Sequence, residues 1–158
     1  MTSVDGSPPG PGVKVPPPLV YVAGFLAGMG VERAFPSPRP PVWLRIAAAA
    51  GGVSALLALD TTAMSRFMRA GTPIIPFRPA TSLVTEGPYR MTRNPMYVGM
   101  GCVYAGAAVA SGALWALATL PGVLLFIDRE VIQREERHLA ATFGEEYEDY
   151  RRRVRRWV

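Results

Sequence analysis

The chain has 158 residues, of which 49% are hydrophobic, and its formal net charge of +5 comes almost wholly from arginine, since Lys14 is its only lysine. This length fits one domain. Because Cys102 and His138 are the only residues of their types, the sequence excludes internal disulfides, metal sites built from several cysteines or histidines, and a Ser-His-Asp triad. We therefore expect no metal centre.

The first 16 residues are predicted to be a disordered leader. They are rich in proline and glycine, and they lack the basic start and the apolar run of a signal peptide. Nothing catalytic is expected there, so residues 17–158 are predicted to form the single folded domain.

Four apolar blocks follow the leader. The last two blocks form one uncharged stretch of 34 residues, from Asn94 to Ile127. As a single helix this stretch would be about 50 Å long, whereas a bilayer's hydrocarbon core is about 30 Å thick. We therefore expect a hairpin that turns at Ala110–Ala113. The predicted fold is an all-α bundle with about four transmembrane helices, at about residues 17–34, 42–65, 95–110 and 113–128.

The distribution of positive charge predicts the orientation of these helices. With a cytoplasmic N-terminus, fourteen of the 17 lysine and arginine residues lie on the cytoplasmic side, and only Arg33, Arg39 and Arg45 lie outside. This is the positive-inside pattern. A soluble bundle of buried helices is the alternative, because each block is only about 15 to 20 residues long. The charge pattern favours an integral membrane protein with both termini in the cytoplasm, in the plasma membrane of a bacterium.

The segment from Ala70 to Gly99 carries the first polar motif. Its prolines exclude a helix through Thr72–Pro79, so a loop at the membrane interface is predicted. Gly87-Pro88 is a turn signal, and Asn94-Pro95 places a proline in the first turn of the third span. These polar residues have a simpler explanation as interfacial anchors, because arginine and tyrosine are common at the headgroup level.

The second polar motif begins at Asp128, and residues 129–158 are predicted to form cytoplasmic helices. On a helical wheel, Glu135 and Glu136 fall in or beside an apolar arc formed by Ile132, Leu139 and Phe143. Carboxylates on a buried face are costly unless a positive charge meets them. Two interpretations follow: a structural ion pair with Arg90 or Arg93, or a site for a cationic ligand.

Beyond Gly144, which is expected to end that helix, a last helix is predicted to reach the C-terminus. Its apolar stripe consists of Tyr147, Tyr150, Val154 and Trp157 or Val158. The arginines between Arg151 and Arg156 lie away from the stripe, as in helices that contact anionic lipid. No nucleic-acid partner is expected, because no nucleic-acid-binding fold accompanies these arginines.

Together these motifs resemble the isoprenylcysteine carboxyl methyltransferase and phospholipid methyltransferase family. The matching elements stand in that family's order, within residues 71–157, about half the chain. Asn94 occupies the position at which isoprenylcysteine enzymes usually carry histidine. The elements are Gly87-Pro88-Tyr89, Arg93-Asn94-Pro95-Met96-Tyr97-Val98-Gly99, Glu135-Glu136 and Phe143-Gly144-Glu145-Glu146-Tyr147-Glu148-Asp149-Tyr150.

The resemblance implies methyl transfer from S-adenosylmethionine to a lipophilic acceptor, such as a lipid or a prenylated substrate. Such transfer needs positioning and desolvation rather than a dedicated base, so His138 is expected to be structural. The alternative function is that of a non-catalytic membrane protein that binds lipid or a partner. The resemblance assigns catalysis to Arg93 and Glu136, and cofactor binding to Tyr89, Arg93, Asn94, Pro95, Tyr97, Gly99, Glu135 and Glu136.

Overall fold

The computed structural model describes residues 12–158 except 14, 70 and 72–80. The predicted loop at Thr72–Pro79 and most of the predicted leader lie outside the described residues. All regular secondary structure in the described part is helical, which confirms the predicted all-α class. The elements are α1 (Pro17–Ala34), α2 (Val42–Arg69), the short 3-10 helix η1 (Gly87–Arg90), α3 (Pro95–Ser111), α4 (Leu114–Ile127), the π-helical turn η2 (Asp128–Ile132), α5 (Gln133–Phe143) and α6 (Glu145–Arg153).

Helix α3 begins and ends where local chemistry requires it. Pro95 occupies its first turn, where the missing backbone N–H is not needed. Gly112 ends it in the left-handed region at φ +76°, and its amide donates back to the carbonyls of Ala108 and Val109. The polypeptide therefore turns within the predicted Ala110–Ala113 segment and continues into α4.

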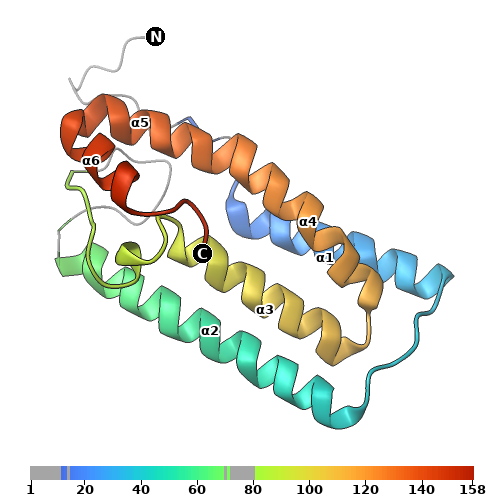
Figure 1. Ribbon diagram of the computed structural model, residues 1–158. Coiled ribbons are helices and arrows are strands. Elements are labelled where there is room, and N and C mark those ends of the chain that lie inside the picture. Colours follow the sequence, from blue (N-terminus) through green and yellow to red (C-terminus); the bar gives the residue numbers. More distant parts are fainter. Residues whose placement is uncertain (1–11, 14, 70, 72–80) are drawn as a thin grey trace.

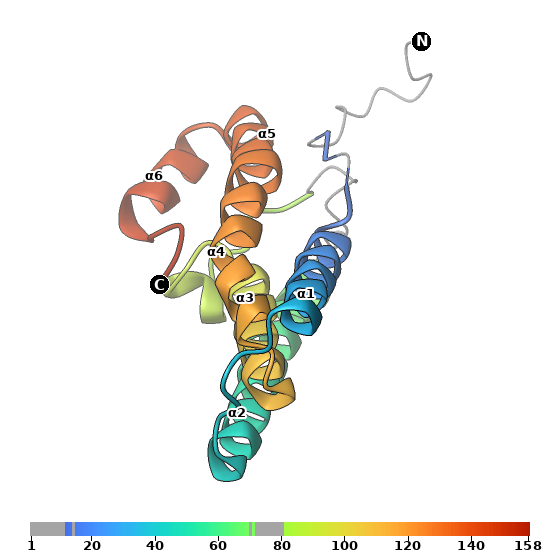
Figure 2. The ribbon, with the colours of Figure 1, turned by 90° about the vertical axis from the view of Figure 1, so that its right-hand side faces the viewer.

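The four long helices form two close pairs, α2 with α3 and α1 with α4, while α3 and α4 form the connecting hairpin (Figures 1 and 2). Glycines make both pairings possible. A Cβ added to Gly106 would lie 2.4 Å from the Ala48 carbonyl oxygen, and one added to Gly28 would lie 2.3 Å from the Ala116 Cα. Small residues at such contacts allow helix backbones to approach closely, as is common in membrane helix bundles.

Helix α4 does not stop at the boundary of the uncharged block. It continues through η2 into α5, and Figure 1 shows one long ribbon from Leu114 to Phe143. A helix of that span is on the order of 45 Å long. Gly144, at φ +54°, ends it, as the sequence predicted. A π-helical turn inside an α-helix is often found at a functional site, and here it lies where the first charged residues follow the apolar segment.

Large apolar side chains face outward along the bundle, including Leu26 on α1, Trp43 and Ile46 on α2, and Leu125 on α4. Within the described residues, one helix is long and apolar enough to cross a membrane: Val42–Arg66, with a mean hydropathy of 1.8. Helices α1, α3 and α4 have 18, 17 and 14 residues. The structure thus has helices at all four predicted blocks and one candidate membrane span.

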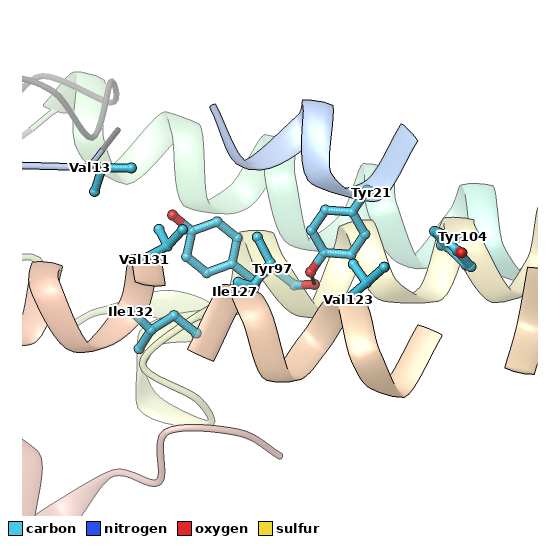
Figure 3. Close-up of a cluster of buried hydrophobic side chains, with 8 residues drawn as sticks. All are labelled: Val13, Tyr21, Tyr97, Tyr104, Val123, Ile127, Val131 and Ile132. Atoms are coloured by element: carbon cyan, nitrogen blue, oxygen red, sulfur yellow. Dashed lines mark hydrogen bonds between the residues drawn. The ribbon is translucent and has the colours of Figure 1, made fainter. Parts of the chain in front are cut away.

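An apolar cluster joins α1, α3, α4 and η2. Within it, the Tyr21 hydroxyl donates a hydrogen bond of 3.0 Å to the Tyr97 carbonyl oxygen and so fixes the start of α3 against α1. Nearby, Tyr104 and Thr119 share a hydrogen bond of 2.7 Å between α3 and α4. Figure 3 shows the cluster, which consists of Val13, Tyr21, Tyr97, Tyr104, Val123, Ile127, Val131 and Ile132.

Candidate functional site

The motif residues gather where the start of α3, η1, α5 and the C-terminal segment 154–158 meet. Tyrosine side chains fix α6 at this meeting point. Tyr89 of η1 is buried in a cluster with Tyr147 and Tyr150 of α6, and the Tyr150 hydroxyl donates a hydrogen bond of 2.8 Å to the Tyr89 carbonyl oxygen. The two tyrosines of the predicted apolar stripe therefore dock the last helix beside the start of α3.

Glu136 of α5 lies in a buried network with two arginines. Its Oε1 accepts from Arg93 Nη2 at 2.7 Å and from Arg156 Nε at 3.1 Å, and its Oε2 accepts from Arg156 Nη2 at 2.6 Å. Glu136 is 8% exposed, and the Arg93 side chain is 10% exposed. The predicted structural pair between a glutamate of this motif and Arg93 is therefore present, with Arg156 as a second partner.

Arg93 also fastens the C-terminal segment to the start of α3. Its Nη1 donates to the carbonyl oxygens of Arg151 at 3.0 Å and Val154 at 2.9 Å, and its backbone N–H donates to the Arg155 carbonyl oxygen at 2.9 Å. Its Nε is buried and has no hydrogen-bond partner in the described structure. One donor of this guanidinium therefore stays unused.

Asn94 also holds the C-terminal segment against the start of α3. Its side-chain Nδ2 donates to the Arg156 carbonyl oxygen at 3.1 Å, and the neighbouring Thr92 hydroxyl donates to that oxygen at 2.8 Å. Asn94 and Thr92 are both buried. The polar residues of the Arg93-Asn94-Pro95 motif thus bind the chain's own C-terminal segment in this structure.

The C-terminal segment differs from the predicted continuous helix. Helix α6 ends at Arg153, because Val154 adopts extended backbone with φ −122° and ψ 134°. Arg156 then turns inward and lies 3.2 Å from Asp128 as well as against Glu136, and Trp157 Nε1 donates to Asp128 at 3.2 Å. The prediction that this helix continues through Arg156, with Arg156 turned away from the apolar stripe, was wrong, since a helical wheel holds only while the helix continues.

Glu135 has a different environment from its neighbour. Its Oε1 accepts a hydrogen bond of 2.8 Å from the Tyr97 hydroxyl of α3. Desolvation raises the pKa of the half-buried Glu135 carboxyl from its ordinary 4.5 to about 7; the Tyr97 hydrogen bond opposes this rise and the charge of Glu136 adds to it. No arginine neutralises Glu135 within the described structure, so this carboxylate retains the capacity to bind a cation.

The structure places the other motif residues in packing positions. Pro95 is fully buried at the start of α3. Gly99, one turn further, faces α2, and a Cβ added there would lie 2.7 Å from Asp60 Oδ1. Gly99 therefore contributes to this region by allowing α2 to approach α3.

Asp60, Asp128 and Arg156 are polar residues of this region that the sequence did not assign to the site, and Arg156 was expected to face anionic lipid. Asp60 is the only acidic residue of α2, and a lone acid inside an apolar span is a signal that sequence alone could have used. Asp128 and Arg156 meet only through the turn after α6, so no local sequence pattern predicts their contact.

The buried polar atoms without a partner in the described part are Asp60 Oδ1, Arg93 Nε and His138 Nε2. That part also holds no group of three or more His, Cys, Asp or Glu side chains placed to bind a metal.

Comparison with known families defines the class of protein. Residues 44–146 match the model of the phospholipid methyltransferase family, a range that contains α3, α4, α5 and both glutamates. The match covers more than half of the chain. The chain therefore belongs to the phospholipid methyltransferase family, and the resemblance of its motifs is confirmed.

Two curated relatives share the sequence over 79 residues. Identity is 40% to the nickel-cobalt-cadmium resistance protein NccN of Alcaligenes xylosoxydans xylosoxydans, and 38% to the cobalt-zinc-cadmium resistance protein CzcN of Cupriavidus metallidurans. Each match covers 49% of this chain, and 36% and 35% of the respective relatives. The matched region thus spans about a third of the length of these relatives.

Proposed function

We propose that this protein is an S-adenosylmethionine-dependent methyltransferase that acts on a lipophilic acceptor at a membrane. One observation carries the proposal: the family's paired glutamate and its α3 motif come together in space, with Glu135 bonded to Tyr97 and Glu136 bonded to Arg93. Membership of the phospholipid methyltransferase family supports methyl transfer as the reaction.

The residues of the site fit the chemistry of that cofactor. S-adenosylmethionine carries an ammonium group and a sulfonium, and a desolvated carboxylate with a raised pKa is stabilised by a nearby cation. Glu135 supplies this carboxylate, and the Tyr97 hydroxyl holds it in place. The unused Nε–H of Arg93 supplies a donor for a carboxylate.

In this proposal Arg93 is the catalytic residue that holds a carboxylate of the cofactor or of the acceptor. Glu136 acts by keeping the Arg93 guanidinium in orientation, and Asn94 keeps the C-terminal segment closed over it. The remaining motif residues shape the walls of the site: Tyr89, Pro95 and Gly99. When bound, the cofactor supplies an electrophilic methyl group, so the contribution of the chain is to orient the reactants and to exclude water.

We further propose that α1 to α4 all cross the membrane, with both termini in the cytoplasm. The family, the outward apolar side chains and the candidate span in α2 support a membrane location, and the positive-inside pattern supports the orientation. This arrangement places Glu135 near the cytoplasmic headgroups, where a lipophilic acceptor in the bilayer can reach it.

Cysteine labelling tests the topology. Cysteines at positions 37 and 111 are expected to react with an impermeant reagent in intact cells. Cysteines at positions 81 and 145 are expected to react only after permeabilisation. Cys102→Ser serves as the background, since Cys102 is the native cysteine. Reaction of position 81 in intact cells would contradict the four-span arrangement.

Calorimetric titration with S-adenosylmethionine tests the site. Glu135→Gln keeps the shape of the side chain but removes its charge, and it is expected to weaken binding about ten- to a hundredfold, the effect of losing a charged hydrogen bond of roughly 1.5–3 kcal/mol. Glu148→Gln is the matched control, because Glu148 pairs with Arg151 on the exposed face of α6. A screen with radiolabelled methyl groups over membrane lipids then identifies the acceptor.

A non-catalytic membrane protein is the second candidate function. The internal pairing of Glu136 with Arg93 and Arg156 favours it, since this part of the motif is satisfied without a ligand. If the wild-type protein fails to bind S-adenosylmethionine under conditions in which it remains folded, this second function replaces the first.

A further inference from the structure

A groove of about 460 Å³ lies outside the candidate site, between the segment before α1 and the junction of α4 with η2. Its floor is apolar and its far end is charged. The lining residues are Val13, Val15, Gly122, Leu125, Phe126, Arg129, Glu130, Val131 and Arg134.

Helix α4 supplies the apolar half of the groove. Leu125 and Phe126 are exposed. Gly122, one turn earlier, hollows the helix surface, because a Cβ added there would meet no atom within 4 Å. An apolar channel on the outer face of this helix is suited to a hydrocarbon chain.

Arginines supply the charged half, immediately beyond the end of α4 at Ile127. Arg129 is exposed and has no ion-pair partner within the part of the chain that the structure describes. Arg134 pairs with Glu130 at 2.8 Å. The groove therefore changes from apolar to positively charged over about two turns, as the interior of a bilayer changes to an anionic headgroup layer.

We infer that this groove binds one anionic phospholipid of the cytoplasmic leaflet, with an acyl chain along Gly122, Leu125 and Phe126 and the phosphate at Arg129. Charge complementarity selects the headgroup, and the apolar floor selects a lipid over a free phosphate. The volume holds only part of a lipid, so the remainder of the acyl chains stays in the bilayer.

This inference rests on the proposed membrane placement and not on methyl transfer. Phosphatidylglycerol, which serves as the probe, has no amine, thiol or free carboxylate to methylate. The groove nevertheless borders the candidate site, since Val13 and Val131 line it and also pack in the cluster that contains Tyr97 (Figure 3).

Native mass spectrometry of the full chain, released from detergent with added lipid, tests the headgroup end. The wild type is expected to retain one phosphatidylglycerol in preference to phosphatidylcholine. Arg129→Gln should weaken this retention about fivefold, the effect of one charge at a membrane surface. Glu130→Gln should strengthen it by a similar factor, because it removes a negative charge and frees Arg134. Arg33→Gln, an exposed arginine in the last turn of α1, is the control and should change nothing.

A pair of glycine substitutions tests the acyl end. Gly122→Leu fills the groove, whereas Gly30→Leu places the same side chain on the exposed surface of α1, where a Cβ also meets no atom within 4 Å. We expect Gly122→Leu to abolish phosphatidylglycerol retention and Gly30→Leu to preserve it, with equal melting temperatures. Glycerol 3-phosphate should not compete with the lipid.

Equal retention of both lipids by the wild type, or equal retention by the two leucine variants, would overturn the site. Competition by glycerol 3-phosphate would show that the groove recognises a phosphate alone and not a lipid. Titration of the same variants with S-adenosylmethionine distinguishes a failure of the lipid site from a failure of the proposed function. If only the lipid site is wrong, the variants bind S-adenosylmethionine as the wild type does.

Discussion

Glu135 and Glu136 are neighbours in the sequence, yet the structure gives them opposite environments. Glu136 meets two guanidinium groups at 2.7 and 2.6 Å, whereas Glu135 meets a neutral phenol hydroxyl at 2.8 Å. Adjacent residues of a helix point about 100° apart. Glu136 therefore faces the contact between the start of α3 and the C-terminal segment, while Glu135 faces the side of α3.

The comparison separates two uses of a carboxylate. A buried carboxylate whose charge is matched within the chain orders the elements that supply its partners, here the start of α3 and the C-terminal segment. A desolvated carboxylate with only a neutral donor keeps part of its charge unmatched, so it favours a cation from outside. Under the proposed function, this difference gives Glu136 a structural role and Glu135 a ligand-binding role, and three measurements test that division.

The largest expected effect is on Glu136. Glu136→Gln leaves the buried Arg93 guanidinium without its anionic partner, and breaking a buried pair in this way costs about 3–5 kcal/mol of unfolding free energy. Thermal unfolding in detergent measures the loss. Glu148→Gln, in an exposed pair with Arg151, should change stability by no more than about 0.5 kcal/mol. An unchanged melting temperature for Glu136→Gln would remove the structural role of this residue.

Next in size is the pH dependence that Glu135 confers. Since its pKa is about 7 in the folded state and 4.5 ordinarily, the folded protein holds this proton more tightly than the unfolded chain does. Glu135 therefore stabilises the fold below pH 4.5, and this contribution is lost as the pH rises to about 7, by an amount on the order of 1–3 kcal/mol.

Unfolding measured from pH 4 to pH 8 in the wild type and in Glu135→Gln isolates that contribution. The stability of the Glu135→Gln protein should not decline between pH 4.5 and 7. At pH 8 its stability should equal or exceed that of the wild type. A decline of the same size in both proteins would show that another group is responsible.

The smallest expected effect concerns the hydroxyl that holds Glu135. Tyr97→Phe removes a hydrogen bond that lowers the pKa of the Glu135 carboxyl, so the upper end of the pH-dependent decline should move from about pH 7 to higher pH. Stability at pH 7 should fall by about 1 kcal/mol. Tyr104→Phe, which loses a hydrogen bond to Thr119 instead, should leave the upper end of the decline at about pH 7. A shift of the upper end in both variants would show that the hydrogen bond from Tyr97 is not the cause.

Local patterns were sufficient for much of this molecule. The length of the uncharged block required a hairpin, and Gly112 made the turn at the expected place. Pro95 began α3 and Gly144 ended α5, because each residue has a backbone preference that operates without long-range contacts. The wheel also placed Glu135 and Glu136 on a face that is buried, since an unbroken helix fixes the direction of its side chains.

Only the tertiary structure decided what those two carboxylates meet. The choice of Arg93 and Arg156 for Glu136, and of Tyr97 for Glu135, depends on where α3 packs and on the turn of the backbone at Val154. Those contacts join residues from 20 to 43 positions apart, and periodicity within one helix carries no information about them. The sequence by itself therefore determined the helices and the polar motifs, while packing between helices decided which glutamate is paired and which remains able to bind a cation.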